Sequence, residues 1–182
     1  MNLLARSSVL AVISGLCSAS ASADVLTVNI DGSADYTTIQ AAIDASADGD
    51  TILLSPAVYY GRINMNGRQV TMRSTQGADL TILDAQGQQG AIVMLDGSET
   101  LSTVIEDVTI RDSTGSNGCG IYVGNSAALT IRDVKFINCS SSNVGGGMRI
   151  TGNAQVVGIP LATRGCPGLG ACRSPPMEKF SR

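Results

Sequence analysis

A nine-residue pattern that occurs twice is the feature that most restricts how this chain folds. Residues 105–113 read IEDVTIRDS and residues 131–139 read IRDVKFINC, with apolar and polar residues at most of the same places, 26 positions apart. A second match follows, because GIYV at 120–123 aligns with GMRI at 147–150 after one inserted residue. Self-similarity at such a period is typical of stacked units, each unable to bury its apolar face alone.

Apolar and polar residues alternate inside each unit. Val134 and Phe136 flank Lys135, and Ile121 and Val123 flank Tyr122. Such runs, separated by Gly, Asn, Asp and Ser, are too short for helices and predict strands between turns. Three short strands per unit, each stacked about 4.8 Å from its equivalent in the next unit, predict an all-β parallel β-helix with three-stranded coils.

This stacking predicts which residues become neighbours in space. Glu106 falls over Arg132, which predicts an outward-facing pair of opposite charges. Asp107 and Asp133 fall at a turn, where Asp tolerates unusual backbone angles. We interpret these two aspartates as turn formers rather than catalysts.

Residues 33–54 follow a different pattern from the repeats. Thr37 and Gln40 have the spacing of a capping box, and Ile39 and Ile43 form an apolar edge at helical spacing before Gly49. We predict a short N-terminal α-helix that ends at Gly49 and caps the open end of the stack, where strand edges would otherwise be exposed.

The first 23 residues have the three-part pattern of a secretory signal peptide. Arg6 is followed by a short apolar run at 9–16 and by small residues that end in Ala21, Ser22 and Ala23. The run is too short to span a bilayer, so we predict cleavage after Ala23 and a secreted or extracytoplasmic protein with no membrane span. A buried N-terminal helix is the alternative interpretation.

Charge is distributed unevenly along the chain. Residues 24–157 contain 14 acidic and 7 basic residues, whereas residues 158–182 contain 4 basic and 1 acidic residue. An acidic body is a poor match for nucleic acid, which proteins bind through Lys and Arg. An acidic polysaccharide would need a bridging cation or a local basic patch.

Cysteine and histidine content limits metal chemistry. The chain has no His, and after cleavage its cysteines would be Cys119, Cys139, Cys166 and Cys172, without the spacing of a zinc site. Export permits disulfides, but four cysteines allow three pairings, and buried unpaired thiols at Cys119 and Cys139 are equally compatible. We predict no cofactor.

Two parts of the chain resemble known proteins. Residues 31–87, from DGSADYTTIQ to ILDAQG, resemble the N-terminal part of the pectin lyase-like, right-handed parallel β-helix superfamily, most of all the opening of pectin methylesterases. The units VIEDVTIRDS and LTIRDVKFINC, with the glycines at 145–147, resemble the repeats of secreted bacterial β-helix proteins and polymorphic outer-membrane proteins. The resemblance implies the fold over residues 25–157. It does not select an activity, because this fold hosts lyases, esterases, hydrolases, adhesins and scaffolds.

Pectin methylesterases use a pair of aspartates, glutamine donors and an arginine, none of which can be assigned here. Their Q-A-V, Q-D-T and G-R-P-W motifs are absent, and Ala57 and Gly61 replace the Gly and Glu of their opening motif around Tyr59. We therefore assign no catalytic residue from this family.

A pectate lyase of this fold needs carboxylates that bind Ca²⁺ and an arginine or lysine that abstracts a proton. The candidates for such a site are Arg111, Lys135, Asp112, Arg149 and Asp133. Arg111 and Lys135 are predicted to point outward on stacked strands and to form a small basic strip. Ca²⁺ would be a cofactor only under this hypothesis.

The repeat pattern stops after Val157. Residues 158–182 lose the alternation and are rich in Pro, Gly and Arg. We therefore predict a signal peptide at 1–23, an incomplete β-helix domain at 24–157 and an irregular tail at 158–182. The break indicates either a stack truncated by a shifted reading frame near Val157 or a disordered Pro/Gly-rich tail.

The leading functional hypothesis is a secreted, non-catalytic module for surface attachment, adhesion or binding of a polysaccharide or cell-surface glycan. Tyr59, Tyr60 and Tyr122 are candidates to stack on sugar rings. The alternative is a lyase or esterase that acts on acidic polysaccharide, with its site partly outside this chain.

Overall fold

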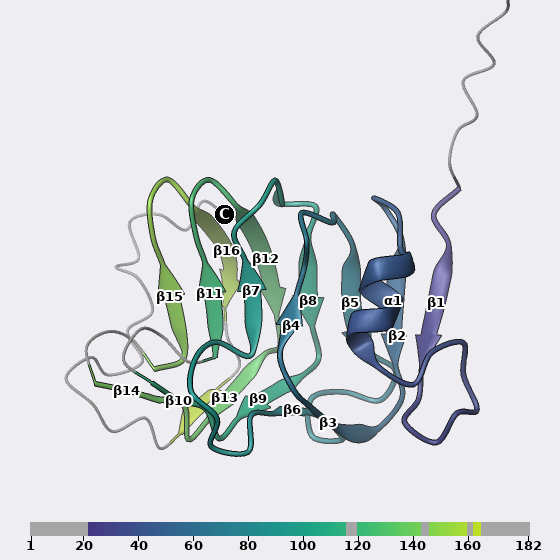
Figure 1. Ribbon diagram of the computed structural model, residues 1–182, viewed down its shortest axis with the longest axis horizontal. Helices are drawn as coiled ribbons and strands as arrows, with labels where there is room; N and C mark the ends of the chain where they lie inside the picture. Colours follow the sequence, from purple (N-terminus) through teal and green to yellow (C-terminus); the bar gives the residue numbers. More distant parts are fainter. Residues whose placement is uncertain (1–21, 116–119, 143–145, 160–161, 165–182) are drawn as a thin grey trace, which may run out of the picture.

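The computed structural model describes residues 22–115, 120–142, 146–159 and 162–164, which wind into stacked coils (Figure 1). Three sheets of parallel strands run along the stack. Sheet A is ordered β1 (Val25–Val28), β2 (Thr51–Leu54), β5 (Thr71–Ser74), β8 (Val104–Glu106), β12 (Ala128–Arg132) and β16 (Gln155–Ile159).

The other two sheets complete each coil. Sheet B is ordered β3 (Ala57–Tyr60), β6 (Thr81–Asp84), β9 (Thr109–Arg111), β13 (Lys135–Ile137) and β17 (Ala162–Arg164). Sheet C is ordered β4 (Ile63–Asn64), β7 (Val93–Leu95), β11 (Ile121–Val123) and β15 (Met148–Ile150). A small pair consists of β10 (Thr114–Gly115) and β14 (Ser140–Ser141). One short helix, α1 (Ile39–Ala45), precedes the first complete coil.

The register of the strands confirms the predicted parallel β-helix. Val104 pairs with Thr130 and Thr109 with Lys135, each 26 positions on. The earlier coils are less regular, since Thr51 pairs with Thr71 and Thr71 with Val104, 20 and 33 positions on. The turns between strands absorb these differences, so the stacked strands keep their register.

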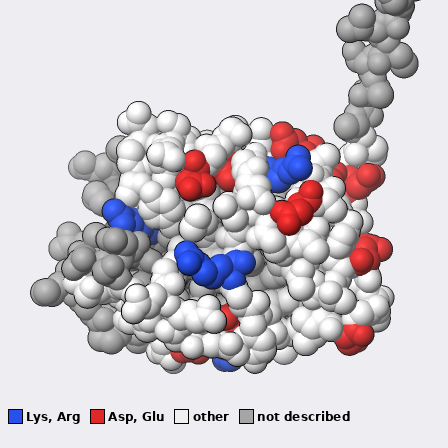
Figure 2. All heavy atoms as spheres, in the orientation of Figure 1, with Lys and Arg blue, Asp and Glu red and all other residues white. Residues whose placement is uncertain are grey.

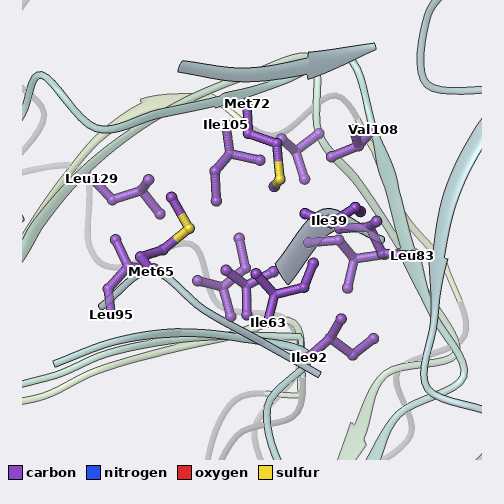
Figure 3. Close-up of a cluster of buried hydrophobic side chains, with 14 of the residues drawn as sticks. Ile39, Ile63, Met65, Met72, Leu83, Ile92, Leu95, Ile105, Val108 and Leu129 are labelled. Atoms are coloured by element: carbon purple, nitrogen blue, oxygen red, sulfur yellow. The ribbon is translucent and has the colours of Figure 1, made fainter. Parts of the chain in front are cut away.

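The core is a set of stacked columns inside the coils. In sheet A, Ile52, Met72, Ile105 and Ile131 lie one above another, and all are buried. Figure 3 shows side chains from all three sheets meeting on the axis of the stack. Burial of each aliphatic side chain contributes about 1.5–3 kcal/mol to the stability of the folded state. Aliphatic columns alone can therefore hold neighbouring coils together.

The structure confirms the predicted neighbours around Glu106. Arg132 Nη1 lies 3.1 Å from Glu106 Oε2, and Arg73 Nη1 lies 4.0 Å from Oε1 of the same carboxylate. Asp107 and Asp133 are turn residues as predicted, with φ of 59° and 49°. This part of the repeat therefore has a structural role.

The charge of Asp107 should lower the stability of this turn. Burial, then the charges of Glu106 and Asp133, raise the pKa of the Asp107 carboxyl group above its ordinary value of 3.8. A carboxyl group with a raised pKa in the folded state binds its proton more tightly there, so stability falls as the pH rises through that pKa. Because asparagine also tolerates positive φ, Asp107→Asn should raise the free energy of unfolding at pH 7 by about 0.5 kcal/mol.

Urea unfolding at pH 7 and near pH 3 measures this difference, which should vanish at the lower pH. Asp112→Asn is the matched control, because Asp112 is also a turn residue, with φ of 56°, but lies 3.2 Å from Arg111 Nε. A gain of equal size in both variants would show that the charge of Asp107 is not the cause.

Helix α1 caps the stack, but its ends differ from the prediction. The N-cap is Thr38, whose Oγ1 accepts a hydrogen bond from Ala41 N, so Thr37 and Gln40 do not form a capping box. The helix ends at Ala45 rather than at Gly49, because the backbone N–H of Ser46 already bonds Ile43 O at 3.2 Å. Its buried face consists of Ile39, Ala42 and Ile43, and it packs against β1, β2 and β4.

Two of the three sheet edges at this end of the stack are closed, each in a different way. In sheet C, Gln40 Oε1 accepts from Asn64 N at 2.9 Å and Gln40 Nε2 donates to Asn64 O at 3.1 Å, so one amide side chain replaces a neighbouring strand. In sheet A, Asp35 Oδ2 accepts from Thr27 N at 2.9 Å, and Tyr36 N donates to Thr27 O at 3.0 Å. Sheet B ends at β3, which pairs only with β6 among the described strands.

The strand ladders continue past Val157, where the sequence pattern suggested a boundary. β16 pairs with β12 as far as Ile159, and β17 pairs with β13. Gly158 has φ of 117°, and a Cβ there would overlap the carbonyl oxygen of Ile131. Glycine therefore allows β16 to lie against β12. The rest of the predicted tail, from residue 165, lies outside the described residues.

Candidate functional site

A row of outward-facing side chains crosses sheet C. Asn64, Met94, Tyr122 and Arg149 occupy equivalent positions on β4, β7, β11 and β15. Because neighbouring strands lie about 4.8 Å apart, these four side chains follow the axis of the stack. We call them the sheet C row; sheet C lies toward the viewer in Figure 1.

Tyr122 and Arg149 form one end of the row. The guanidinium carbon of Arg149 lies 5.8 Å from the centroid of the Tyr122 ring, within the range of a cation–π interaction. Tyr122 Oη lies 3.1 Å from Thr151 Oγ1. A Cβ at Gly124 would lie 2.6 Å from the Tyr122 ring, so this glycine lets the ring lie along the sheet.

Arg62 lies beside the other end of the row. Its Nε donates to Ala91 O at 3.0 Å, and its Nη2 lies 3.6 Å from Met94 Sδ. A Cβ at Gly90, where φ is 98°, would lie 2.9 Å from Arg62 Nη2. No carboxylate of the described residues forms an ion pair with Arg62. Figure 2 shows that this face is largely uncharged, with basic side chains well separated from one another.

A cleft of about 280 Å³ opens next to Arg62, between β3 and the segment that leads into α1. Ile30 and Tyr60, 55% and 63% exposed, lie on its walls. Thr37 and Gln40 also line it, and Arg62 is its one charged lining residue within the described structure.

The lyase candidates do not come together in one strip. Arg111 Nη2 and Nε lie 2.8 Å and 2.9 Å from Asp84 Oδ2, and Lys135 is paired with Asp79. The two cations also lie in different columns, because Lys135 is in register with Thr109 whereas Arg111 is in register with Ile137. Each is therefore neutralised by its own carboxylate.

The remaining lyase candidates lie elsewhere. Asp112 is a turn residue that contacts Arg111 and accepts a hydrogen bond from Asn138 Nδ2 at 3.1 Å. Asp133 occupies the turn between β12 and β13, and Arg149 belongs to sheet C. Among the residues that the structure describes, no three His, Cys, Asp or Glu side chains are grouped so that they could hold a metal ion.

Two further predictions concern Tyr59 and the cysteines. Tyr59 is buried, and its hydroxyl lies 2.8 Å from Ser55 O and 3.0 Å from Val28 O, so it is not a surface for sugars. Its burial raises the pKa of the phenol to about 12.

Cys139 is a buried free thiol whose pKa is raised by burial. Cys119, Cys166 and Cys172 lie outside the described residues.

The stacked coils form a parallel β-helix, which is the architecture that the resemblance of the sequence implied. Among solved structures, a pectin methylesterase from carrot is similar, with a TM-score of 0.42 and 15% sequence identity; the match covers 85% of this chain and 66% of the carrot chain. The chain thus spans just under two thirds of the length of that protein. No family model and no curated protein matches the sequence. No helix in the described part of the chain is long and apolar enough to cross a membrane.

Proposed function

We propose that this protein is an exported, non-catalytic module that binds a glycan along the sheet C row. The row supports this proposal because it combines the groups that bind sugars. The aromatic ring of Tyr122 suits the apolar face of a sugar ring, and Asn64 and Arg149 suit hydroxyl or carboxylate groups.

The spacing of the row also supports a glycan rather than a small molecule. Consecutive members are one strand apart, about 4.8 Å, which is close to the length of one sugar ring in an extended chain. Met94 lies between Asn64 and Tyr122 in the register, so the row has a side chain on every strand. Successive sugars could therefore contact successive coils.

Charge favours an acidic glycan. Arg62 and Arg149 lie near opposite ends of the row, on a protein whose net charge is −3. An extended acidic polysaccharide that spans the row can place one carboxylate at each of these two separated cations. Guanidinium groups bind carboxylates in planar, bidentate geometry, so this proposal needs no bridging Ca²⁺.

The ion pairs on sheet B favour binding over catalysis. A lyase needs an arginine or lysine that is available to accept a proton. Arg111 and Lys135 each form an ion pair with a carboxylate, so neither is a free base. The predicted signal peptide supports export of the protein. Export would bring it to glycans of the cell surface or matrix.

Binding of polygalacturonate tests the proposal. Tyr122→Ala should weaken binding about tenfold in isothermal titration calorimetry, because it removes the stacking surface and the cation–π partner of Arg149. Lys135→Ala is the control, since Lys135 lies on sheet B and should leave the affinity unchanged. The same titration with and without Ca²⁺ tests for a bridging ion.

Two results would contradict this function. Equal loss of affinity in both variants would mean that polygalacturonate binds through overall charge. Unsaturated sugar product or released methanol on incubation with pectin would identify an enzyme of the lyase or esterase class.

A further inference from the structure

The outer edge of β3 differs from the other two sheet edges at the capped end of the stack. Gln40 pairs with the edge of sheet C, and Asp35 and Tyr36 pair with the edge of sheet A. No group in the described ranges does the same for β3. An unpaired strand edge is a template for another extended chain.

The direction of the backbone groups follows from the ladder. Ala85 N donates to Arg111 O, so the backbone groups of Leu83, two residues earlier, also point to β9, whereas those of Ile82 and Asp84 point to β3. In β3 itself, Ala57 and Tyr59 must therefore pair with β6, and the backbone groups of Val58 and Tyr60 point away from it. These outward groups have no backbone or side-chain hydrogen-bond partner among the described residues.

This edge opens on the cleft of about 280 Å³ described above. Val58 and Tyr60 line the cleft together with Ile30 and Thr37 from the opposite wall. Ile30 and Tyr60 are also two of the few large hydrophobic side chains that remain exposed. Strand edges that bind peptides combine these features: backbone groups supply hydrogen bonds, and adjacent apolar surface receives alternate side chains.

We propose that β3 binds an extended, acidic peptide segment of a partner protein by strand addition. The backbone of such a segment carries alternating N–H and C=O groups that match Val58 and Tyr60. Its apolar side chains would contact Ile30 and Tyr60. A glutamate or aspartate would face Arg62, which is the charged residue of the cleft and has no ion-pair partner in the described part of the chain.

The length of β3 limits the site. The strand has 4 residues, so the occupant adds a strand of similar length. Its affinity comes from a small number of hydrogen bonds and one apolar contact area. This surface is separate from the Tyr122 end of the sheet C row, so the peptide proposal does not depend on glycan binding.

Fluorescence anisotropy with a synthetic peptide tests the proposal. The probe is a fluorescein-labelled, capped peptide of alternating valine and threonine with one central glutamate. Two derivatives carry N-methyl groups on alternate residues, in opposite phases. The derivative whose methylated groups should face β3 is expected to bind at least about tenfold more weakly than the probe, and the other derivative about as well as the probe.

Val58→Pro tests the hydrogen bond that the backbone N–H of Val58 would donate to the peptide. Proline removes the N–H that points away from β6 and is tolerated on strand edges, so this variant should keep its melting temperature and lose at least about tenfold in peptide affinity. Val58→Thr keeps the N–H and a β-branched side chain and should bind the peptide normally. Tyr122→Ala should also bind it normally.

Three outcomes would overturn the proposal. The first is no binding of the probe at millimolar concentration. The second is equal affinity of the two methylated derivatives. The third is a dimer in sedimentation velocity that Val58→Pro dissociates, because the edge would then pair with a second copy of this chain. Since the methylated peptides are compared on the unchanged protein, the test holds even where Val58→Pro fails to fold.

Discussion

Replacement of Glu99 by alanine is expected to lower the free energy of unfolding by about 1–3 kcal/mol, because two backbone N–H groups at a partly buried site lose their acceptor. Glu99 is 2% exposed. Its Oε1 accepts from Gly67 N and its Oε2 accepts from Gly97 N, both at 2.9 Å. One carboxylate thus joins the turn after β4 to the turn after β7.

The surroundings of Glu99 show that its carboxylate lies where several coils meet. A Cβ on Gly97 would lie 3.2 Å from Gly67 Cα, so the two turns are in close contact. The backbone oxygen of Glu99 accepts from Ala128 N at 2.8 Å, which extends the connection toward β12. Loss of this side chain should therefore loosen the stack at several coils.

Urea denaturation measures this prediction. Glu99→Gln should lie between the wild type and Glu99→Ala, since an amide oxygen replaces one acceptor while the NH₂ group faces the second N–H donor. Glu106→Ala is the control, because its ion pairs lie at the surface and should contribute less than about 1 kcal/mol. Similar losses for Glu99→Ala and Glu106→Ala would contradict the role assigned to burial.

Phe136→Ala is expected to lower the free energy of unfolding by about 3–5 kcal/mol, which is the range for removing a buried aromatic side chain from a well-packed core. Phe136 is 2% exposed and is in register with Ile110 on the preceding coil. A Cβ on Gly120 would lie 2.8 Å from the ring, so the ring also packs closely against the chain entering β11. The cavity would therefore border two sheets.

Thermal and urea unfolding of Phe136→Ala should show a cooperative transition at lower stability, with the m-value preserved. Tyr60→Ala is the matched control, because Tyr60 is an exposed aromatic on the same sheet and should change stability by less than about 0.5 kcal/mol. A small loss for Phe136→Ala would mean that the core around β13 is poorly packed.

The two proposed binding surfaces meet at Arg62. Its guanidinium group lies against Met94 of the sheet C row and also lines the cleft beside β3. Variants of Arg62 would therefore affect both surfaces. Tyr122→Ala and Val58→Pro separate them, because each changes one surface alone.

Local pattern in the sequence was enough to predict the fold. The alternation around Lys135 and the 26-residue offset determine which side chains point inward and which coil lies over which, as the pairing of Phe136 with Ile110 confirms. The turn role of Asp107 and Asp133 and the pair of Glu106 with Arg132 follow from the same offset. These predictions depend only on neighbours in the chain and on the 26-residue offset, which holds between β8 and β12 and between β9 and β13.

The candidate sites required the tertiary structure, because their residues are separated by offsets that vary. Asn64, Met94, Tyr122 and Arg149 form one row at separations of 30, 28 and 27 residues. Local spacing made Gln40 a capping-box residue, whereas the fold uses its amide to close the edge of β4. Arg111 is a free cation in the sequence pattern, but the stack places Asp84 beside it. Period and alternation therefore determine the coil, while turn lengths and side-chain partners, which are set only when the coils pack, decide where this protein can bind.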